Sequence, residues 1–548
     1  MILLASPQII AGAGAVLGVV SHLAYFIHGE HHHQAFRYFV AFLTFPVAAT
    51  AAQLLVLGVP TVVGAVRQTA LFYTAYLTGL YASVFLYRAF FHRLHAFPGP
   101  FGAKISKLWH VWKVAPTIDN YKHLTRMHAQ YGTFVRTGPN EVSTIHPDAI
   151  EVLYGASSKC TKGAGYEGNS DLTSMHSTRS RRHHDLRRKA WARGFTQNSL
   201  REYEPRVERY TQSLIEQIRA FSGQPINAAQ WFNYYSFDVM GDLAFAKDFD
   251  MLKNGQKHWA IEILNAGQRG IGVFGPVPWL FIIISSIPQI TKEFRKFIQF
   301  CEDMMEERMK MKVDRPDISS WILQSPPMTG TRYSERAWLT GDSRLIIVAG
   351  SDTTAATLTH LFYHLAKDQS QLELLREEVQ SLEGDLQASK LLTLKHLNGA
   401  INEALRLHPP VPSGVGRLTP PEGITIGGTY IPGNVNVLAP SYPLFRSPEC
   451  YEYPDEFIPE RWYSKPELLK RSDAFAPFLI GPYSCIGKQL ALMEIRSVTA
   501  QILLNFDVTF GPGEDGTTLL EKTLDTFTME LAPLNLCFVP RKQEVVEA

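Results

Sequence analysis

The first 87 residues contain only three formally charged side chains, which are Glu30, Arg37 and Arg67. Three apolar runs fill this region, at residues 3–27, 38–59 and 69–87. Each run is close to the roughly 20 residues that a helix needs to cross the hydrocarbon core of a bilayer. The alternatives are one anchor followed by two buried hydrophobic helices, and a cleaved signal peptide, which would need a basic leader. We predict a membrane region over residues 1–95 with about three transmembrane helices.

Basic residues follow the third run closely: Arg88, Arg93, Lys104 and Lys107. Because loops rich in Lys and Arg stay on the cytosolic side, the large C-terminal part is predicted to be cytosolic. An odd number of spans then places the N-terminus in the lumen, and we expect a multi-pass protein of the endoplasmic reticulum membrane. The polar cluster in the first cytosolic loop contains His28, Glu30, His31, His32 and His33. It offers metal ligands, but a solvated loop is the preferred interpretation.

The segment 96–103 contains two prolines and two glycines, which oppose helix formation and predict a stiff hinge. Charge density is ordinary from residue 104 to 548, where we predict a single cytosolic catalytic domain. Alternation over residues 132–138 predicts a strand, and residues 430–438 predict another strand region. Most of residues 180–410 shows helical periodicity. The expected fold class is mainly α with a minor β-sheet region, preceded by the transmembrane helices.

Composition excludes several classes of protein. The 53 basic and 51 acidic side chains give a formal charge of +2, so no nucleic-acid partner is expected. An apolar content of 45% is ample for a large folded core. The five cysteines are scattered, odd in number and without CxxC spacing, which argues against a disulfide framework or a zinc module.

Cys485 lies between glycines and directly before an apolar helical pattern that starts at Lys488. A helix N-terminus favours a thiolate, and flanking glycines let a flat cofactor approach the backbone. Such a thiolate is a suitable axial ligand for haem iron. The alternative is a buried cysteine that only packs in the core and does not react. The same stretch matches the phosphate-binding pattern G-x-x-x-x-G-K at residues 481–488. That pattern requires Ser or Thr next, and Gln489 stands there.

Three further motifs precede the cysteine loop in order: Ala-Gly-Ser-Asp-Thr-Thr at 349–354, Glu-Ala-Leu-Arg at 403–406 and Pro-Glu-Arg-Trp at 459–462. Together with Cys485 they resemble the cytochrome P-450 family of haem-thiolate monooxygenases, from about residue 97 to the C-terminus. The cysteine loop and the multi-span N-terminus look most like fungal members that act in secondary metabolism. The resemblance implies a bound haem, iron protoporphyrin IX, and the fold of that family.

The resemblance also assigns expected roles to residues of this chain. Cys485 would be the axial ligand of the haem iron, and the other cofactor-binding residues would be His184, Arg188, Arg417, Phe478 and Gly487. Glu403, Arg406 and Arg461 would form a structural charge network behind the cysteine loop. One departure stands at Tyr483, where the family usually has Arg or His, because a phenol supplies no positive charge to a haem propionate.

On the distal side, Asp352 and Thr353 match the acid–alcohol pair with which the family delivers protons to bound oxygen. Gly350 would leave room for that oxygen. About 60 residues follow Cys485, too few for a flavin domain, so electrons are expected from NADPH through a separate NADPH–cytochrome P-450 reductase. Lys488, Arg187 and Lys189 are expected to be solvated or to face that partner.

The predicted function is a membrane-bound monooxygenase that inserts one oxygen atom from O2 into a lipophilic small molecule. Residues 157–180 and 268–290 are expected to contribute to its substrate pocket. One alternative is a haem-thiolate isomerase or dehydratase of peroxides, relatives of which typically lack the acid–alcohol pair. A second is a non-catalytic haem-binding protein. A membrane channel is disfavoured, because the spans hold no ionisable residues that suggest a pathway.

Overall fold

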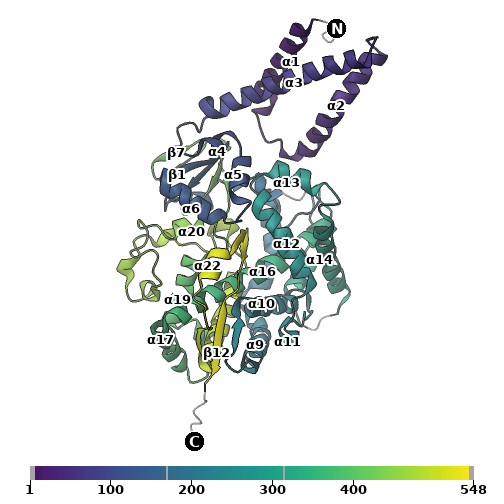
Figure 1. Cartoon of the computed structure of the whole chain (residues 1–548). Helices are drawn as coiled ribbons and strands as arrows, with labels where there is room; N and C mark the ends of the chain where they lie inside the picture. The colour runs from purple at the N-terminus through teal and green to yellow at the C-terminus, as the bar shows by residue number, and fades with distance from the viewer. Residues whose placement is uncertain (1–5, 168–170, 313–314, 542–548) are drawn as a thin grey trace, which may run out of the picture.

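The structure, a computed structural model, describes residues 6–167, 171–312 and 315–541 (Figure 1). Three long helices project from one end of the molecule: α1 (Pro7–Ser21), α2 (Ala35–Leu55) and α3 (Val62–Leu86). Short helical segments adjoin them: η2 (His22–Phe26), η3 (His32–Gln34) and η4 (Tyr87–Phe91). Their apolar stretches are long enough to cross a membrane, at Pro7–Phe26, His32–Leu55 and Val62–Phe91. The apolar N-terminal helices are therefore compatible with membrane anchoring, as the fold prediction required.

Small residues let α1 and α3 approach closely. A Cβ atom at Gly18 would overlap the backbone of Tyr76, and one at Gly79 would overlap the backbone of Ala15. Close contact through small residues is the usual way in which helices associate in lipid, where apolar burial gives no driving force. Between α2 and α3, Gln53 is fully buried and donates from Nε2 to the Thr69 hydroxyl at 2.6 Å.

The segment with two prolines lies along the edge of a sheet. The carbonyl of Pro98 accepts from the Arg136 backbone N–H at 2.7 Å, and Arg88 donates to the Ile105 carbonyl at 2.8 Å. A Cβ atom at Gly99 would overlap the backbone of Arg136, so only glycine permits this approach. The junction is thus packed against the domain.

Helices form most of the large domain. The long ones are α6 (Asn120–Tyr131), α8 (Arg181–Ala192), α9 (Gln197–Ala220), α10 (Ala228–Phe245), α12 (Trp259–Phe274), α14 (Lys292–Lys310), α16 (Glu335–Lys367), α17 (Gln369–Gln380), α19 (Lys395–Leu407) and α21 (Lys488–Asn505). The short ones are α4 (Phe101–Ile105), α5 (Leu108–Val114), α7 (Ala149–Tyr154), α11 (Met251–Asn254), α13 (Pro278–Ser285), α15 (Ile318–Leu323), α18 (Ala388–Leu391), α20 (Ser441–Leu444) and α22 (Thr517–Lys522). Further short helical turns are η5 (Ala164–Glu167), η6 (Arg193–Phe195), η7 (Pro459–Trp462), η8 (Pro466–Leu468), η9 (Ser472–Ala474) and η10 (Gly481–Tyr483).

In the described part of the chain, strands make four small sheets. The strands are β1 (Phe134–Gly138), β2 (Glu141–Thr144), β3 (Thr161–Lys162), β4 (Pro225–Asn227), β5 (Arg417–Leu418), β6 (Ile424–Ile426), β7 (Thr429–Ile431), β8 (Asn436–Leu438), β9 (Phe506–Phe510), β10 (Leu524–Thr526), β11 (Thr528–Glu530) and β12 (Asn535–Pro540). The largest sheet has the order β1-β2-β8-β5-β3, in which only β2 and β8 pair in parallel. The others are β4-β12-β9, β10-β11 and β6-β7. The predicted class, mainly α with minor sheets, is confirmed.

The centre of the large domain is α16, which runs through its middle (Figure 1). Its first turn is capped by Ser334, whose hydroxyl accepts from the Ala337 N–H. It is apolar enough to span a membrane, but 72% of its most apolar stretch is buried within the protein. It is a core helix, packed against α10, α14, α19 and α21.

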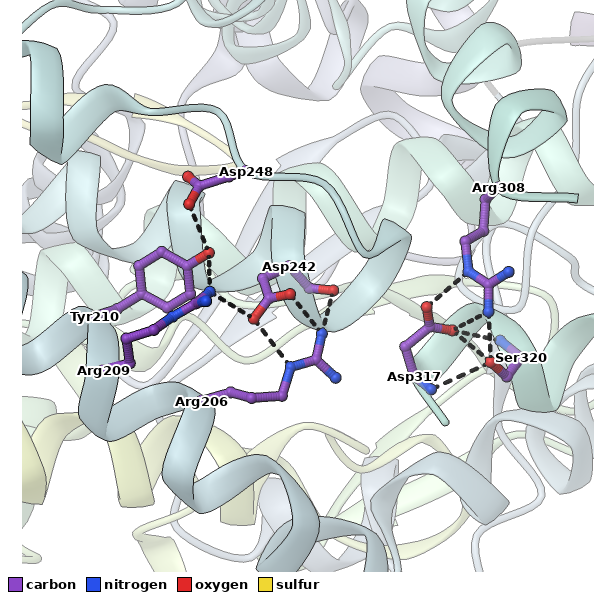
Figure 2. A network of polar contacts seen from close by, with 8 residues as sticks. All are labelled: Arg206, Arg209, Tyr210, Asp242, Asp248, Arg308, Asp317 and Ser320. Atoms are coloured by element: carbon purple, nitrogen blue, oxygen red, sulfur yellow. Dashed lines mark hydrogen bonds and ion pairs between the residues drawn. The ribbon is translucent and has the colours of Figure 1, made fainter. Parts of the chain in front are cut away.

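Buried or half-buried ion pairs fix the helices around α16 (Figure 2). Arg206 of α9 donates two hydrogen bonds to the Asp242 carboxylate of α10, at 2.9 and 2.7 Å. Arg308 of α14 does the same to Asp317, at 2.7 and 3.2 Å, and Asp317 caps α15 through the Ser320 N–H. Such pairs of parallel hydrogen bonds between an arginine and a carboxylate add geometric specificity to the packing of neighbouring helices.

Candidate active site

The loop around Cys485 joins η10 to the start of α21. The Cys485 N–H donates to the Phe478 carbonyl at 2.8 Å, which closes the loop. Gly487 is the N-cap of α21, and a Cβ atom there would lie 4.0 Å from the Cys485 Sγ and 3.9 Å from the Phe195 ring. Phe478 is half-buried and lies near the Lys488 ammonium. The absence of a side chain at Gly487 therefore leaves the space beside the sulfur open.

Cys485 is exposed as a residue, while protein atoms closely surround its sulfur. Desolvation by the surrounding protein raises the pKa of this thiol, while the N–H groups of Gly487 and Lys488 and the Arg188 guanidinium act in the opposite direction. A bound metal ion removes the proton of a coordinating thiol outright. The loop therefore has the donors that favour a thiolate, and a metal cation would complete the stabilisation.

A cluster of cations lies beside the loop. Strands β3 and β5 pair so that Lys162 stands directly opposite Arg417, and both side chains are buried. Like charges in directly opposed positions of a sheet repel each other. The Lys162 ammonium donates to the backbone carbonyls of Met175 and His176, and burial together with Arg417 and Arg188 holds the pKa of Lys162 well below its ordinary value.

Aromatic rings surround Arg417. Its guanidinium carbon lies 5.0 Å from the centroid of the Tyr154 ring, 5.0 Å from that of Tyr483 and 5.8 Å from that of Tyr166. The Tyr166 hydroxyl accepts from Arg417 at 2.7 Å, whereas the buried Arg417 Nε has no hydrogen-bond partner. Among the described residues, neither Lys162 nor Arg417 forms an ion pair with a carboxylate. The cluster is thus an unneutralised site for an anion.

Tyr483 packs against His184, with ring centroids 4.6 Å apart. The His184 Nδ1 lies 2.9 Å from the Asp185 carboxylate, which can only accept a hydrogen bond, so Nδ1 carries the proton. Burial lowers the pKa of His184 to about 4 despite Asp185. A neutral His184 has no second N–H to donate, so it would assist an anion only once that anion had raised its pKa.

The basic residues of α8 have separate partners. Arg188 donates to the Ser484 carbonyl at 2.7 Å and thereby holds the residue before Cys485. Arg187, which the sequence placed at the surface, is buried: its Nε donates to Asp342 of α16 at 2.5 Å. That expectation was wrong because Asp342 lies 155 residues away in the chain and is visible only in the fold. Lys189 and Lys488 are exposed as expected.

Asp352 lies on α16 and is buried against α12 and β11. Its Oδ2 accepts from Gln268 Nε2 at 3.3 Å and from the Thr528 hydroxyl at 3.4 Å. Burial raises the pKa of Asp352 to about 6, although these two hydrogen bonds lower it. Next to Gln268, Arg269 is exposed and pairs with Glu530 at 2.7 Å, so the protein surface begins one residue from a hydrogen-bond partner of the acid.

Thr353 and Gly350 differ in what they contact. The Thr353 hydroxyl donates to the Ala349 carbonyl at 2.9 Å, and Ala349 is exposed although most of α16 is buried. A Cβ atom at Gly350 would lie 2.6 Å from the Met240 side chain of α10. A side chain here would force Met240 to move, so Gly350 lets α10 pack closely on α16, and its role in leaving room for oxygen stays a prediction.

Glu403 accepts from two arginines in a buried network. Its carboxylate oxygens take hydrogen bonds from Arg406 at 2.9 and 2.8 Å and from Arg461 at 2.9 Å. Trp462 adds a fourth at 2.9 Å, so the tryptophan at this position of the motif has a hydrogen-bonding role. All three charged side chains are fully buried. The network joins α19 to η7, some 58 residues later in the chain.

We expect Glu403→Gln to destabilise the domain by about 3–5 kcal/mol, because two buried guanidinium groups then lose their counter-charge. Thermal unfolding of the purified protein measures the effect. Glu467→Gln is the matched control, since Glu467 is exposed on η8. An unchanged unfolding temperature for Glu403→Gln would show that the network does not stabilise the fold.

Comparison with known proteins decides the family. Residues 98–538 match the sequence profile of the cytochrome P450 family. This chain is a cytochrome P450. It is 43% identical over 535 residues to the tryprostatin B 6-hydroxylase of Aspergillus fumigatus, which covers 95% of this chain and 94% of the relative. A cytochrome P450 monooxygenase of Aspergillus versicolor is 42% identical (94% and 95% covered), and one of Purpureocillium lilacinum is 39% identical (98% and 99% covered).

The family assignment confirms the resemblance seen in the four motifs. This P450 is a monooxygenase, an oxidoreductase that incorporates molecular oxygen, and its family holds a haem. Sequence reasoning missed Lys162 and Tyr166 of the site. No motif marks them: Lys162 is brought beside Arg417 by the pairing of β3 with β5, and Tyr166 of η5 contacts Arg417 through its hydroxyl.

Proposed function

We propose that this P450 hydroxylates a lipophilic metabolite in a fungal secondary pathway, with the haem bound between Cys485 and the 349–353 turn of α16. The observation that carries the proposal is the unneutralised pair Lys162 and Arg417 beside the cysteine loop. A haem brings two propionates, and these anions would neutralise the two opposed cations. The residues present therefore fit the cofactor that the family implies.

The proposed division of labour follows from the donors. Cys485 would hold the iron, and Arg188 would keep the cysteine loop in place through Ser484. Gly487 would leave space for the haem ring, and Phe478 would border that space. Lys162 and Arg417 would bind the propionates, and His184 would join them when protonated. Bound haem supplies the activation of molecular oxygen, to which a thiolate ligand contributes by favouring O–O cleavage.

Asp352 and Thr353 would supply protons. Asp352, with a pKa near 6, can exchange its proton close to neutral pH, and Gln268 and Thr528 keep its carboxylate oriented. The Thr353 hydroxyl lies on the accessible side of α16, one turn from Ala349. We expect Thr353 to orient the proton and Asp352 to renew it. With protons delivered by these two side chains, the rest of the site can exclude bulk water.

Thr353→Ala should leave substrate binding intact and uncouple the reaction. A positioned proton donor contributes about 100- to 10,000-fold, so product formed per NADPH should fall by about tenfold or more while NADPH consumption continues. Quantifying NADPH, product and hydrogen peroxide in the same reaction measures this. Thr357→Ala, one turn further along α16, also removes a hydroxyl that bonds the i−4 carbonyl and should stay coupled. Full coupling in Thr353→Ala would exclude this proton route.

The reaction class is tested with ¹⁸O2. Membranes that contain this P450 and an NADPH–cytochrome P450 reductase should transfer one labelled oxygen atom to the product and consume NADPH. Tryprostatin B is a reasonable first substrate, because a relative is named for its hydroxylation. An unlabelled product formed from a peroxide without NADPH would instead support the isomerase, and haem without turnover of any metabolite would support a binding protein.

The exposed Lys189 and Lys488 are candidate contacts for the reductase.

The proposed topology places the large domain in the cytosol at the endoplasmic reticulum, with residues 1–95 as membrane region and 96–103 as junction. The loop between the first two apolar helices supports it: Glu30 pairs with Arg179 of the large domain at 2.6 Å, so both lie on the same side. One span then separates them from the N-terminus.

In sealed microsomes, an N-terminal tag should therefore survive added protease, whereas a C-terminal tag should be removed. The N-terminal tag should become sensitive once detergent opens the vesicles. Digestion of the N-terminal tag in intact vesicles would contradict three spans. Removal of residues 1–95 should release most of the domain, with residual binding through the apolar α13, which contacts α2.

A further inference from the structure

The loop between η2 and α2 meets the large domain through charged and histidine side chains. Arg179 donates to both oxygens of Glu30 at 2.6 and 3.0 Å, and also to Glu167 of η5 at 3.0 Å. On the same Glu167 oxygen, His33 Nε2 lies at 2.8 Å and His32 Nε2 at 3.3 Å. The sequence suggested a solvated loop, but His32 is buried here because Glu167, 135 residues later, closes over it.

The ligand atoms of His32, His33 and Glu167 all lie within 4.8 Å of one another. In a tetrahedral zinc site, bonds of about 2.0–2.2 Å place neighbouring ligand atoms about 3.3 Å apart. The separations of 2.8 and 3.3 Å from the Glu167 oxygen are close to that value. The His33 side chain is 38% exposed, which leaves an open side where water can be the fourth ligand.

Charge also permits a cation, although Arg179 is adjacent. Two carboxylates, Glu30 and Glu167, stand against two guanidinium groups, Arg179 and the nearby Arg332, so with neutral imidazoles the cluster carries no net positive charge that would repel a cation. Arg179 is held by Glu30 and by the Lys162 carbonyl at 2.9 Å, so it keeps partners if a metal takes its contact to Glu167.

We propose that His32, His33 and Glu167 form a zinc site that fastens the loop of the membrane region to the segment bearing η5. Two imidazoles and one carboxylate suit Zn²⁺, whereas Ca²⁺ and Mg²⁺ prefer oxygen ligands alone. The segment that zinc would fasten lies beside the cation cluster of the candidate active site. Glu167 follows Tyr166, whose hydroxyl bonds Arg417, and the segment also contains Lys162 near Tyr483. Zinc would thus restrain the side of the active site where the cations gather.

The first experiment measures zinc on the full-length, haem-loaded protein in nanodiscs. After metal removal, equilibrium dialysis against buffered Zn²⁺ and elemental analysis should find one zinc ion per chain. His33→Ala and Glu167→Gln should each weaken binding by at least about 100-fold, the share of one ligand in a structural site. His28→Ala removes an exposed histidine of the same loop and should have no effect.

If His28→Ala loses as much zinc affinity as the ligand variants, or if both ligand variants keep the wild-type zinc affinity, the binding is adventitious and the proposal is overturned. An unchanged Soret absorption confirms that each variant is folded, and Glu167→Gln keeps the shape of the side chain. Zinc-edge X-ray absorption should show two imidazole ligands and oxygen. Hydrogen exchange in residues 161–167 should slow on zinc addition in the wild type but not in His33→Ala. Zinc binding without that protection would contradict the fastening.

Discussion

Cys485→Ser should abolish the red-shifted Soret band of the reduced carbon-monoxide complex and all oxygenation. The hydroxyl of serine is not ionised at neutral pH, so it cannot replace a thiolate as the iron ligand. Difference spectroscopy on membranes, with total haem measured in parallel, checks the result. The effect is a complete loss, because every later step of the proposed reaction requires a coordinated iron.

Cys537→Ser is the matched control. Cys537 is half-buried on β12 and belongs to the β4-β12-β9 sheet, so its replacement should leave the band unchanged. Cys160, Cys301 and Cys450 are buried, and burial raises the pKa of each thiol, as expected for inert packing. A band retained in Cys485→Ser would refute the ligand assignment.

Sequence patterns predicted the elements whose signal is local. The many helices between residues 180 and 410, the strand β1, and the strand region 430–438, where β7 and β8 lie, all follow from periodicity. The third apolar helix begins earlier than its apolar run, at Val62, because one Arg and one Gln are tolerated within an otherwise apolar helix. The family itself followed from four motifs in order.

Contacts between distant segments could not be predicted in this way. Strands β3 and β5 have two residues each, too short for any pattern, yet their pairing sets Lys162 opposite Arg417. Arg187 and His32 looked solvated in the sequence because Asp342 and Glu167 are remote in the chain. Tyr483 shows how such contacts change the interpretation of a motif. A basic side chain stands beside that position instead, because the Lys162 nitrogen lies 4.9 Å from the centroid of the Tyr483 ring.

Asp352→Asn should lower turnover by about 100- to 10,000-fold, because an amide cannot renew the proton that the reaction consumes. The pH dependence identifies the group. With a pKa of about 6, Asp352 is protonated below pH 6 and loses its proton above it. If the acid form limits the rate, wild-type turnover should fall as pH rises above 6, approaching tenfold per unit.

The variant should lack this dependence, since asparagine does not titrate. Steady-state turnover between about pH 5.5 and 8, at saturating reductase and substrate, makes the comparison. Asp238→Asn is the control: burial raises the pKa of Asp238 to about 6 as well, but its carboxylate accepts from the N–H groups of Met251 and Leu252. This control should keep the wild-type profile. A pH profile unchanged in Asp352→Asn would show that the titrating group lies elsewhere and that α16 does not renew the proton.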